Sequence, residues 1–319
     1  MEDELAISVR GLRKAYGDNV AVAGVDLDVH RGEVFALLGP NGAGKTTTVE
    51  ILEGYRQRDA GQVSVLGSDP GLVFGSRLRG SQARSSHDPG LVFGSRLRGS
   101  RAGSAPTSRR QAADWRSRVG IVLQGTGEFD ELTVAEVVRH FSGFYPGADD
   151  PDKVVERVGL GAKANARTHT LSGGQKRRLD VALGIIGRPE LLFLDEPTTG
   201  FDPEARREFW ELIRDLAAAG TTIVLTTHYL DEAESLADRV GVIAAGRVIE
   251  VAPPNLLGNR QDALATVSWR TPDGTPETAQ SATPTALVAE LAARFGGEVP
   301  GLTVTRPTLE DIYLSMIGH

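Results

Sequence analysis

The sequence predicts an α/β protein with a mainly parallel β-sheet. Short apolar runs rich in Val, Ile and Leu recur along the chain, and stretches of helical pattern separate several of them. Near-continuous apolar strands that alternate with helices are typical of a sheet covered on both faces. The first 30 residues differ, because their spaced apolar positions predict an antiparallel hairpin. We therefore expect a parallel core with an antiparallel β portion.

The elements of this core follow one another in a regular order. The predicted strands are Val34–Leu38, Gln62–Leu66, Val119–Leu123, Leu191–Leu194 and Thr222–Leu225. The predicted helices are Lys45–Gly54, Val134–Phe144, Gln175–Ile186 and Pro203–Ala218. Thr133 precedes the second helix and Glu136 stands three residues later, which is the sequence signature of a capping box.

The chain after about Pro254 forms a second predicted unit, so we divide the protein into residues 1–253 and 254–319. Its expected elements are a strand at Ala265–Trp269, a polar stretch at Thr271–Thr283, a helix near Ala286–Phe295, a strand at Leu302–Thr305 and a last helix from Thr308. This order predicts a small α+β C-terminal domain.

Residues 71–105 interrupt the α/β order. The sequence Asp69–Ser81 returns identically as Asp88–Ser100, and the stretch is rich in Gly, Ser and Arg. Such a composition buries too little apolar surface to offset its ordering entropy. One interpretation is a looped-out, disordered insertion from duplicated coding sequence. The other is a basic arm that contacts anionic lipid headgroups or a partner.

The bulk composition excludes several classes of function. The formal net charge of −7 argues against a dedicated nucleic-acid binder, and the lack of cysteine excludes disulfides and thiolate chemistry. The acidic start Met1–Glu4 does not resemble a signal peptide. The longest apolar runs are far shorter than the roughly 20 residues of a membrane-spanning helix. We expect a cytoplasmic chain without a nucleic-acid partner, whose membrane role comes through another protein.

The strongest motif is a phosphate-binding P-loop. Gly39–Thr46 matches the pattern G-x-x-x-x-G-K-S/T, directly after a predicted strand and at the start of a predicted helix. Glycines let backbone N–H groups surround phosphates, Lys45 reaches the β- and γ-phosphates, and the Thr46 hydroxyl takes a Mg²⁺ position. The residues expected to contact the nucleotide here are Gly39, Pro40, Asn41, Gly42, Ala43, Gly44, Lys45, Thr46 and Thr47.

Two carboxylates follow the apolar strand Leu191–Leu194. Asp195 and Glu196 stand where the strand ends, the edge at which ligands bind in open α/β sheets. Asp195 suits Mg²⁺ coordination. Glu196 suits a general base that deprotonates an attacking water. An Asp-Glu pair alone could also be a helix cap, and the P-loop is what favours the catalytic interpretation.

A second glycine turn opens the helix that follows Leu171. Ser172, Gly173, Gly174 and Gln175 precede an apolar helix face, so they form a second candidate anion site at a helix start. One nucleotide does not need two such sites on one chain. We therefore expect a head-to-tail dimer in which this turn covers the γ-phosphate held by the other copy. Taken alone, Leu171–Gln175 could also be a simple capping turn.

Together these motifs resemble the ATP-binding cassette (ABC) proteins over roughly residues 4–255, apart from the insertion. The residues that carry the resemblance are Tyr16-Gly17, Gly39–Thr46, Gln124, Leu171–Gln175, Asp195-Glu196, Asp202 and His228, in that order. The resemblance implies a P-loop NTPase core with a helical subdomain that carries the Ser172 turn. It also implies ATP and Mg²⁺ as cofactors.

The resemblance assigns further roles. Tyr16 would stack on adenine, and Gln124 would sense Mg²⁺ and the γ-phosphate and signal to a membrane subunit. Asp202 would belong to the loop that joins the two nucleotide sites of the dimer, and His228 would contact the γ-phosphate. The catalytic set is thus Glu196, His228, Lys45 and Gln124, and the metal set is Thr46, Gln124 and Asp195. Phe201 departs from the usual Leu beside Asp202, and we expect this change to be tolerated.

Three further segments look like the drug-exporter branch that includes daunorubicin-resistance ATPases. They are Thr133–Glu136, Arg178–Leu183 and Pro307–Leu314. The resemblance implies an exporter subunit at the cytoplasmic face of the membrane, paired with itself and driving a separate permease. Two rival hypotheses are a cassette ATPase that acts on ribosomes or DNA, and a regulatory protein that binds ATP without hydrolysing it.

Overall fold

The computed structural model describes residues 5–73, 109–122 and 129–318. The described chain divides into two compact units, residues 1–249 and 250–319. Among the described residues, none of the helices has the length and apolar character that crossing a membrane requires.

The central sheet of the first unit has six strands in the order β5-β6-β7-β3-β8-β9. Their bounds are β3 Val34–Leu38, β5 Val119–Val122, β6 Leu191–Asp195, β7 Thr222–Thr227, β8 Arg239–Ala244 and β9 Arg247–Ala252. The pairs within β5-β6-β7-β3-β8 are parallel, as the sequence predicts. All five residues of β3 are buried, which explains their continuous apolar character.

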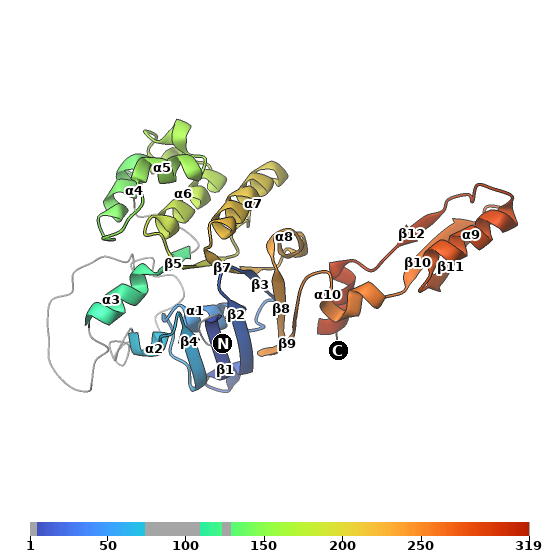
Figure 1. Ribbon diagram of the computed structural model, residues 1–319, viewed down its shortest axis with the longest axis horizontal. Coiled ribbons are helices and arrows are strands. Elements are labelled where there is room, and N and C mark those ends of the chain that lie inside the picture. Colours follow the sequence, from blue (N-terminus) through green and yellow to red (C-terminus); the bar gives the residue numbers. More distant parts are fainter. Residues whose placement is uncertain (1–4, 74–108, 123–128, 319) are drawn as a thin grey trace. The chain divides into compact units, whose positions relative to one another are not determined.

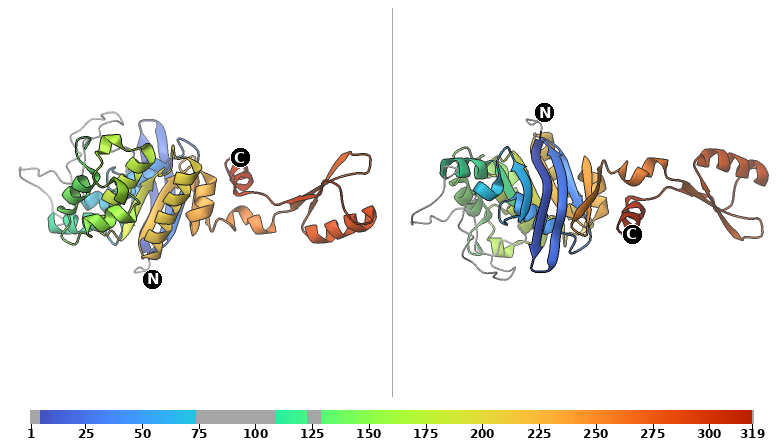
Figure 2. Two further views of the ribbon diagram at one scale, coloured as in Figure 1. Left: turned by 90° about the horizontal axis from the view of Figure 1, so that it is seen from above. Right: turned by 90° about the horizontal axis from the view of Figure 1, so that it is seen from below.

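A second, antiparallel sheet has the order β2-β1-β4. β1 (Leu5–Tyr16) and β2 (Asn19–His30) run side by side as a long hairpin, which confirms the antiparallel prediction (Figure 2). β4 spans Ala60–Val65 and pairs with β1. Helix α1 (Lys45–Leu52) contacts both β2 and β4 and so joins this sheet to the P-loop.

Helices α4 (Val134–Ser142), α5 (Pro151–Arg157) and α6 (Gly173–Ile185) lie together as a helical subdomain (Figure 1). Thr133 and Glu136 form the capping box that the sequence predicts for α4. The apolar face of α6 is buried. Helices α7 (Pro203–Ala218) and α8 (Leu230–Leu236) contact each other. The remaining helices of the first unit include α2 (Pro70–Val73) and α3 (Arg109–Ser117).

The second unit has its own small core. Strands β10 (Ala265–Arg270), β11 (Pro276–Ser281) and β12 (Thr303–Thr305) form an antiparallel sheet in the order β11-β10-β12. Helix α9 (Pro284–Phe295) covers this sheet, and the shared core is Val267, Trp269, Leu291 and Val299. Helix α10 (Leu309–Ile317) contacts a short 3-10 segment at Leu257–Asp262. β11 lies inside the stretch that the sequence marks only as polar.

Candidate functional site

The site lies at the carboxyl edge of the parallel sheet. β3 and β7 end level with each other at Leu38 and Thr227, and β6 ends with Asp195 beside Thr226. The chain leaves these three strands into the P-loop, a turn that begins with Glu196, and the segment leading to α8. Because all three strands point the same way, residues far apart in the sequence meet at one edge.

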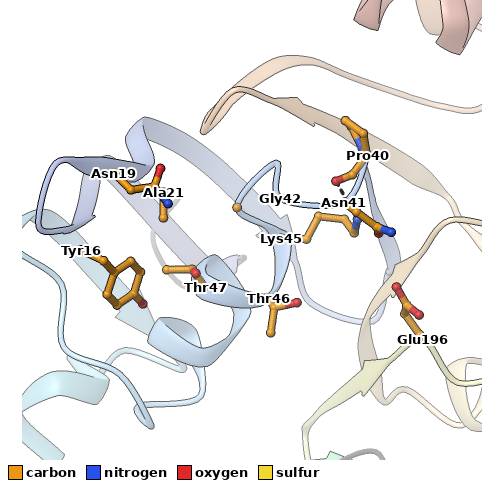
Figure 3. Close-up of a pocket in the computed structure, with 11 residues that line it drawn as sticks. Tyr16, Asn19, Ala21, Pro40, Asn41, Gly42, Lys45, Thr46, Thr47 and Glu196 are labelled. Carbon is orange, nitrogen blue, oxygen red and sulfur yellow. Dashed lines mark hydrogen bonds between the residues drawn. The ribbon is translucent and has the colours of Figure 1, made fainter. Parts of the chain in front are cut away.

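The P-loop borders a cavity of about 260 Å³ (Figure 3). Its lining residues are Tyr16, Asn19, Ala21, Pro40, Asn41, Gly42, Gly44, Lys45, Thr46, Thr47 and Glu196. Gly39 and Ala43 are buried in the loop behind this lining. The cavity thus has an aromatic side chain from the hairpin and a cation, a hydroxyl and a carboxylate from the sheet edge.

Gly44 keeps the cradle open. Its φ is 101°, and a Cβ at this position would lie 2.4 Å from the carbonyl oxygen of Ala21. α1 begins directly after Gly44, and no side chain caps its first N–H groups. Uncapped N–H groups at the positive end of a helix dipole favour an anion. The loop therefore fits the phosphates of a nucleotide.

The Lys45 ammonium is held inside the loop. Its Nζ donates to the carbonyl oxygens of Gly39 at 2.6 Å and Pro40 at 3.2 Å, and the residue is 6% exposed. Burial lowers the pKa of Lys45, and the nearby carboxylates of Glu196 and Asp195 oppose that shift. A buried, pre-positioned cation at the cavity is suited to the negative charge of a phosphate.

The Asp195-Glu196 pair has an unusual backbone. Glu196 lies in the left-handed region at φ 43°, which costs a non-glycine residue about 1–2 kcal/mol. Its N–H donates to the carbonyl oxygen of Thr226 at 3.1 Å, and the Thr226 hydroxyl also donates to the Asp195 carboxylate. Strain of this kind persists where surrounding contacts impose it, and it often marks a functional position.

His228 lies beside the glutamate. Its Nδ1 is 3.3 Å from Glu196 Oε1, and the His228 ring packs at 4.1 Å from the Tyr229 ring. Thr199 Oγ1 donates to Glu196 Oε2 at 3.4 Å. The structure thus brings the predicted γ-phosphate contact next to the predicted base, and Glu196 is the one of the two that lines the cavity.

Tyr16 lines the cavity from the end of β1. Its ring is 40% exposed, with Lys14 Nζ at 5.5 Å and the Arg56 guanidinium carbon at 5.2 Å from the ring centroid. Asn19 and Ala21, which line the cavity with it, are absent from the sequence prediction. Asn19 pairs with Tyr16 across the hairpin turn, so the hairpin register is the signal that locates it.

The Ser172 turn begins α6 with a complete capping box. Gln175 N donates to Ser172 Oγ at 3.3 Å, and Ser172 N donates to Gln175 Oε1 at 3.1 Å. Ser172, Gly173, Gly174 and Gln175 are not among the residues that line the cavity. Within one copy of the chain, this turn and the P-loop are therefore separate candidate anion sites.

The sequence pattern of the family described as ABC transporter matches residues 22–199, which is more than half of the chain. The chain belongs to the ABC transporter family. It is 34% identical to the daunorubicin resistance ATP-binding protein DrrA3 of Streptomyces coeruleorubidus, over 99% of this chain and 96% of that protein. It is also 34% identical to the Nod factor export ATP-binding protein I of Burkholderia orbicola, over 98% and 97%.

Solved cassettes share the fold. The structure of cbiO1 from Clostridium perfringens, part of the transporter complex cbiONQ, is 26% identical with a TM-score of 0.61, over 79% of this chain and 90% of cbiO1. A dimeric, post-hydrolysis structure of the cassette MJ0796 bound to ADP and Pi is 21% identical with a TM-score of 0.59, over 77% and 98%. The predicted family, P-loop NTPase fold and ATP-hydrolase class are confirmed.

Two further residues of the sequence prediction are Gln124 and Asp202. Gln124 lies outside the described residues, as does most of the duplicated stretch at 71–105. Asp202 caps α7, and its carboxylate accepts from the N–H groups of Glu204 at 3.0 Å and Ala205 at 2.8 Å. The neighbouring Phe201 packs edge to face on Phe209, with 5.6 Å between ring centroids.

Proposed function

We propose that this chain is the ATP-driven motor subunit of an exporter, bound at the cytoplasmic face of the membrane to a separate permease. The relatives named for daunorubicin resistance and for Nod factor export cover almost the whole chain. Both names refer to the removal of a substance from the cell or to protection from it. A drug, an antibiotic or another hydrophobic compound is the proposed cargo.

The observation that carries the hydrolytic function is the position of Glu196, which lines the cavity that the P-loop borders. In the proposed mechanism Tyr16 stacks on the adenine, and Lys45 with the α1 N-terminus holds the phosphates. Glu196 accepts a proton from the attacking water. His228, 3.3 Å away, contacts the γ-phosphate and restrains the Glu196 carboxylate.

Thr46 and Asp195 are the proposed Mg²⁺ ligands, together with Gln124. Within the described ranges, no three His, Asp or Glu side chains gather into a metal site of their own. Mg²⁺ sites for nucleotides commonly use one or two protein oxygens plus phosphate oxygens, so a hydroxyl and one carboxylate fit this ion. The ion would neutralise negative charge on the phosphates.

The Ser172 turn supports a homodimer. Since Ser172 to Gln175 do not line the cavity of their own chain, we propose that they contact the nucleotide held by a second copy. ATP would then close two copies around two nucleotides, and hydrolysis would release them. The segment 128–136, next to Gln124, is the proposed contact with the permease. Residues 254–319 form the proposed accessory C-terminal domain.

The variant Glu196→Gln tests this function. We expect it to lower the rate of ATP hydrolysis by about 10²–10⁴-fold, because an amide cannot accept the proton of water. ATP binding should be retained, and the ATP-bound dimer should live longer in size-exclusion chromatography.

The matched variant is Lys45→Ala, which should weaken nucleotide binding itself because the phosphates lose their buried cation. Unchanged hydrolysis in Glu196→Gln would remove Glu196 as the base. A protein that stays monomeric with ATP and Mg²⁺ after that change, with its permease present, would contradict the dimer.

A further inference from the structure

A second buried cation lies behind the catalytic strand. Arg177 is only 8% exposed, although it belongs to α6, the helix that the Ser172 turn opens. Its Nη2 donates to the carbonyl oxygen of Asp195 at 2.6 Å, and its Nε donates to the carbonyl oxygen of Pro197 at 3.2 Å. One guanidinium from the helical subdomain therefore holds the backbone of the sheet edge.

These two carbonyl groups flank Glu196 on both sides. Glu196 is the residue in the left-handed region at φ 43°, a conformation that needs support from its surroundings. The Thr226 carbonyl accepts from the Glu196 N–H at 3.1 Å, and Arg177 holds the carbonyl group of the residue before Glu196 and that of the residue after it. The carboxylate reaches the cavity from a backbone that is held at three points.

The electrostatic surroundings keep Arg177 in place. Its Nη1 lies 3.8 Å from the Asp180 carboxylate, one turn further along α6, and Asp180 is 6% exposed. Burial lowers the pKa of Arg177, while the charges of Asp180, Asp195 and Glu232 raise it. A buried cation persists where carboxylates and hydrogen-bond acceptors surround it.

We propose that Arg177 is a positioning residue that fixes Glu196 and couples it to the Ser172 turn of the same chain. The proposal rests on the proposed role of Glu196 as the base. Ser172 and Arg177 stand on the first two turns of one helix, so a shift of the Ser172 turn moves the donors that hold Glu196. Contact of the Ser172 turn with the second copy would thereby adjust the catalytic carboxylate of the first.

The test compares Arg177→Lys with Arg178→Lys in the full chain. Lysine keeps the charge but lacks the planar fork that reaches two carbonyl groups. Arg178 is the matched control because it bonds the Val158 carbonyl at 3.4 Å and pairs with Glu208, both away from Glu196. Thermal unfolding of both variants shows whether each is folded before any rate is compared.

The first measurement is steady-state hydrolysis. For Arg177→Lys we expect kcat to fall by about 10–100-fold, because small misplacements of catalytic groups cost this much. The KM for ATP should stay within about twofold, because Arg177 is absent from the residues that line the cavity. For Arg178→Lys we expect neither change.

The second measurement needs no nucleotide. Backbone amide exchange over residues 192–200 should become about tenfold faster in Arg177→Lys and stay unchanged in Arg178→Lys. A purely structural role for Arg177 would instead lower the unfolding temperature while leaving kcat per folded molecule and this local exchange unchanged. That result would overturn the proposal.

A double-mutant cycle tests the coupling. If Arg177 links the Ser172 turn to Glu196, Ser172→Ala should lower kcat less in the Arg177→Lys background than in the unsubstituted chain. Additive effects would overturn the coupling.

If the unsubstituted chain hydrolyses ATP and Glu196→Gln does not, but Arg177→Lys keeps full kcat, only this inference fails. If Glu196→Gln keeps full activity, the proposed base itself fails.

Discussion

Two helices of this cassette begin at candidate anion sites, and they begin in different ways. α1 follows Gly44, which has φ 101° and no side-chain cap, so its first N–H groups have no side-chain acceptor. α6 follows Ser172, whose hydroxyl already accepts from Gln175 N while the Gln175 side chain accepts from Ser172 N. One helix start is uncapped, and the other is capped by its own residues.

This difference in capping suggests that the two helix starts bind an anion in different ways. An uncapped start offers backbone donors and needs an anion to satisfy them, which suits a site that holds phosphate continuously. A capped start has two of its backbone N–H groups satisfied by its own side chains, and its hydroxyl hydrogen remains available to donate. This second arrangement suits a contact that forms and breaks in each cycle.

Gly44→Ala should remove the uncapped start. The new Cβ would lie 2.4 Å from the Ala21 carbonyl oxygen, and alanine is strained at φ 101°. We expect the loop to shift and ATP affinity to fall by about 100-fold or more, since each 1.4 kcal/mol costs tenfold. Titration with a fluorescent ATP analogue measures the affinity.

Gly11→Ala is the control for backbone strain alone. Gly11 also has a positive φ, 57°, but no atom lies within 4 Å of an added Cβ. This variant should lose about 1 kcal/mol of folding stability and bind ATP normally. If Gly44→Ala also bound ATP normally, the open cradle would not be what makes α1 a phosphate site.

Ser172→Ala should have an intermediate effect. It removes the capping hydroxyl, which costs about 1 kcal/mol of stability, and also the donor available to a nucleotide on a second copy. We expect kcat for hydrolysis to fall about tenfold while ATP affinity for one copy is unchanged, since the cavity of that copy lacks Ser172. Steady-state kinetics and binding by the monomer distinguish the two quantities.

Asp150→Ala is the matched cap variant, because the Asp150 carboxylate caps α5 by accepting from Asp152 N at 3.0 Å. It should cost similar stability, about 1 kcal/mol, and leave kcat unchanged. Equal losses of kcat in the two variants would mean that Ser172 acts only as a helix cap.

The sequence predicts the buried strands best, because burial on both faces forces continuous apolar runs. β3 has the predicted bounds, and so does α7, where Pro203 follows the capping residue Asp202. The prediction misses β8, a buried strand whose apolar run is interrupted by Gly241, and it misses β9 and β11, which contain no buried residue. Such strands depend on backbone pairing with a neighbour, and pairing across long separations leaves little trace in side-chain pattern.

The residues of the functional site also fall into a group that the sequence predicts and a group that it does not. The P-loop and the Asp195-Glu196 pair are contiguous in sequence, and both can be predicted from it. Ala21 and Arg177 were not predicted, because their roles depend on contacts that only the fold creates. Ala21 meets Gly44 across the hairpin, and Arg177 reaches Asp195 from 18 residues away in the sequence.

Buried charges further along these two helices extend the comparison. α6 buries a cation with a carboxylate, Arg177 with Asp180, 3.8 Å apart. α1 ends at Glu53, which is 3% exposed, and burial raises the pKa of Glu53 well above its usual value. The charges of Asp195 and Glu50 raise this pKa further. A helix C-terminus also disfavours negative charge.

Glu53→Gln should therefore stabilise the protein at neutral pH, by about 2–4 °C in unfolding temperature. Because the folded pKa of Glu53 exceeds the unfolded one, the folded state binds more protons between the two values, and the free energy of unfolding falls as pH rises through that window. Glutamine lacks this titration. The gain over the unsubstituted chain should be larger at pH 8 than at pH 6, and it should shrink further as the pH falls towards the unfolded pKa. Glu50 also lies on α1, and Glu50→Gln, which breaks its 2.5 Å pair with Arg56 beyond the helix end, should give no gain. A gain in stability for Glu53→Gln that stays constant between pH 8 and pH 5 would contradict this prediction. It would mean that the gain comes from better packing of the glutamine side chain and not from removal of a buried charge.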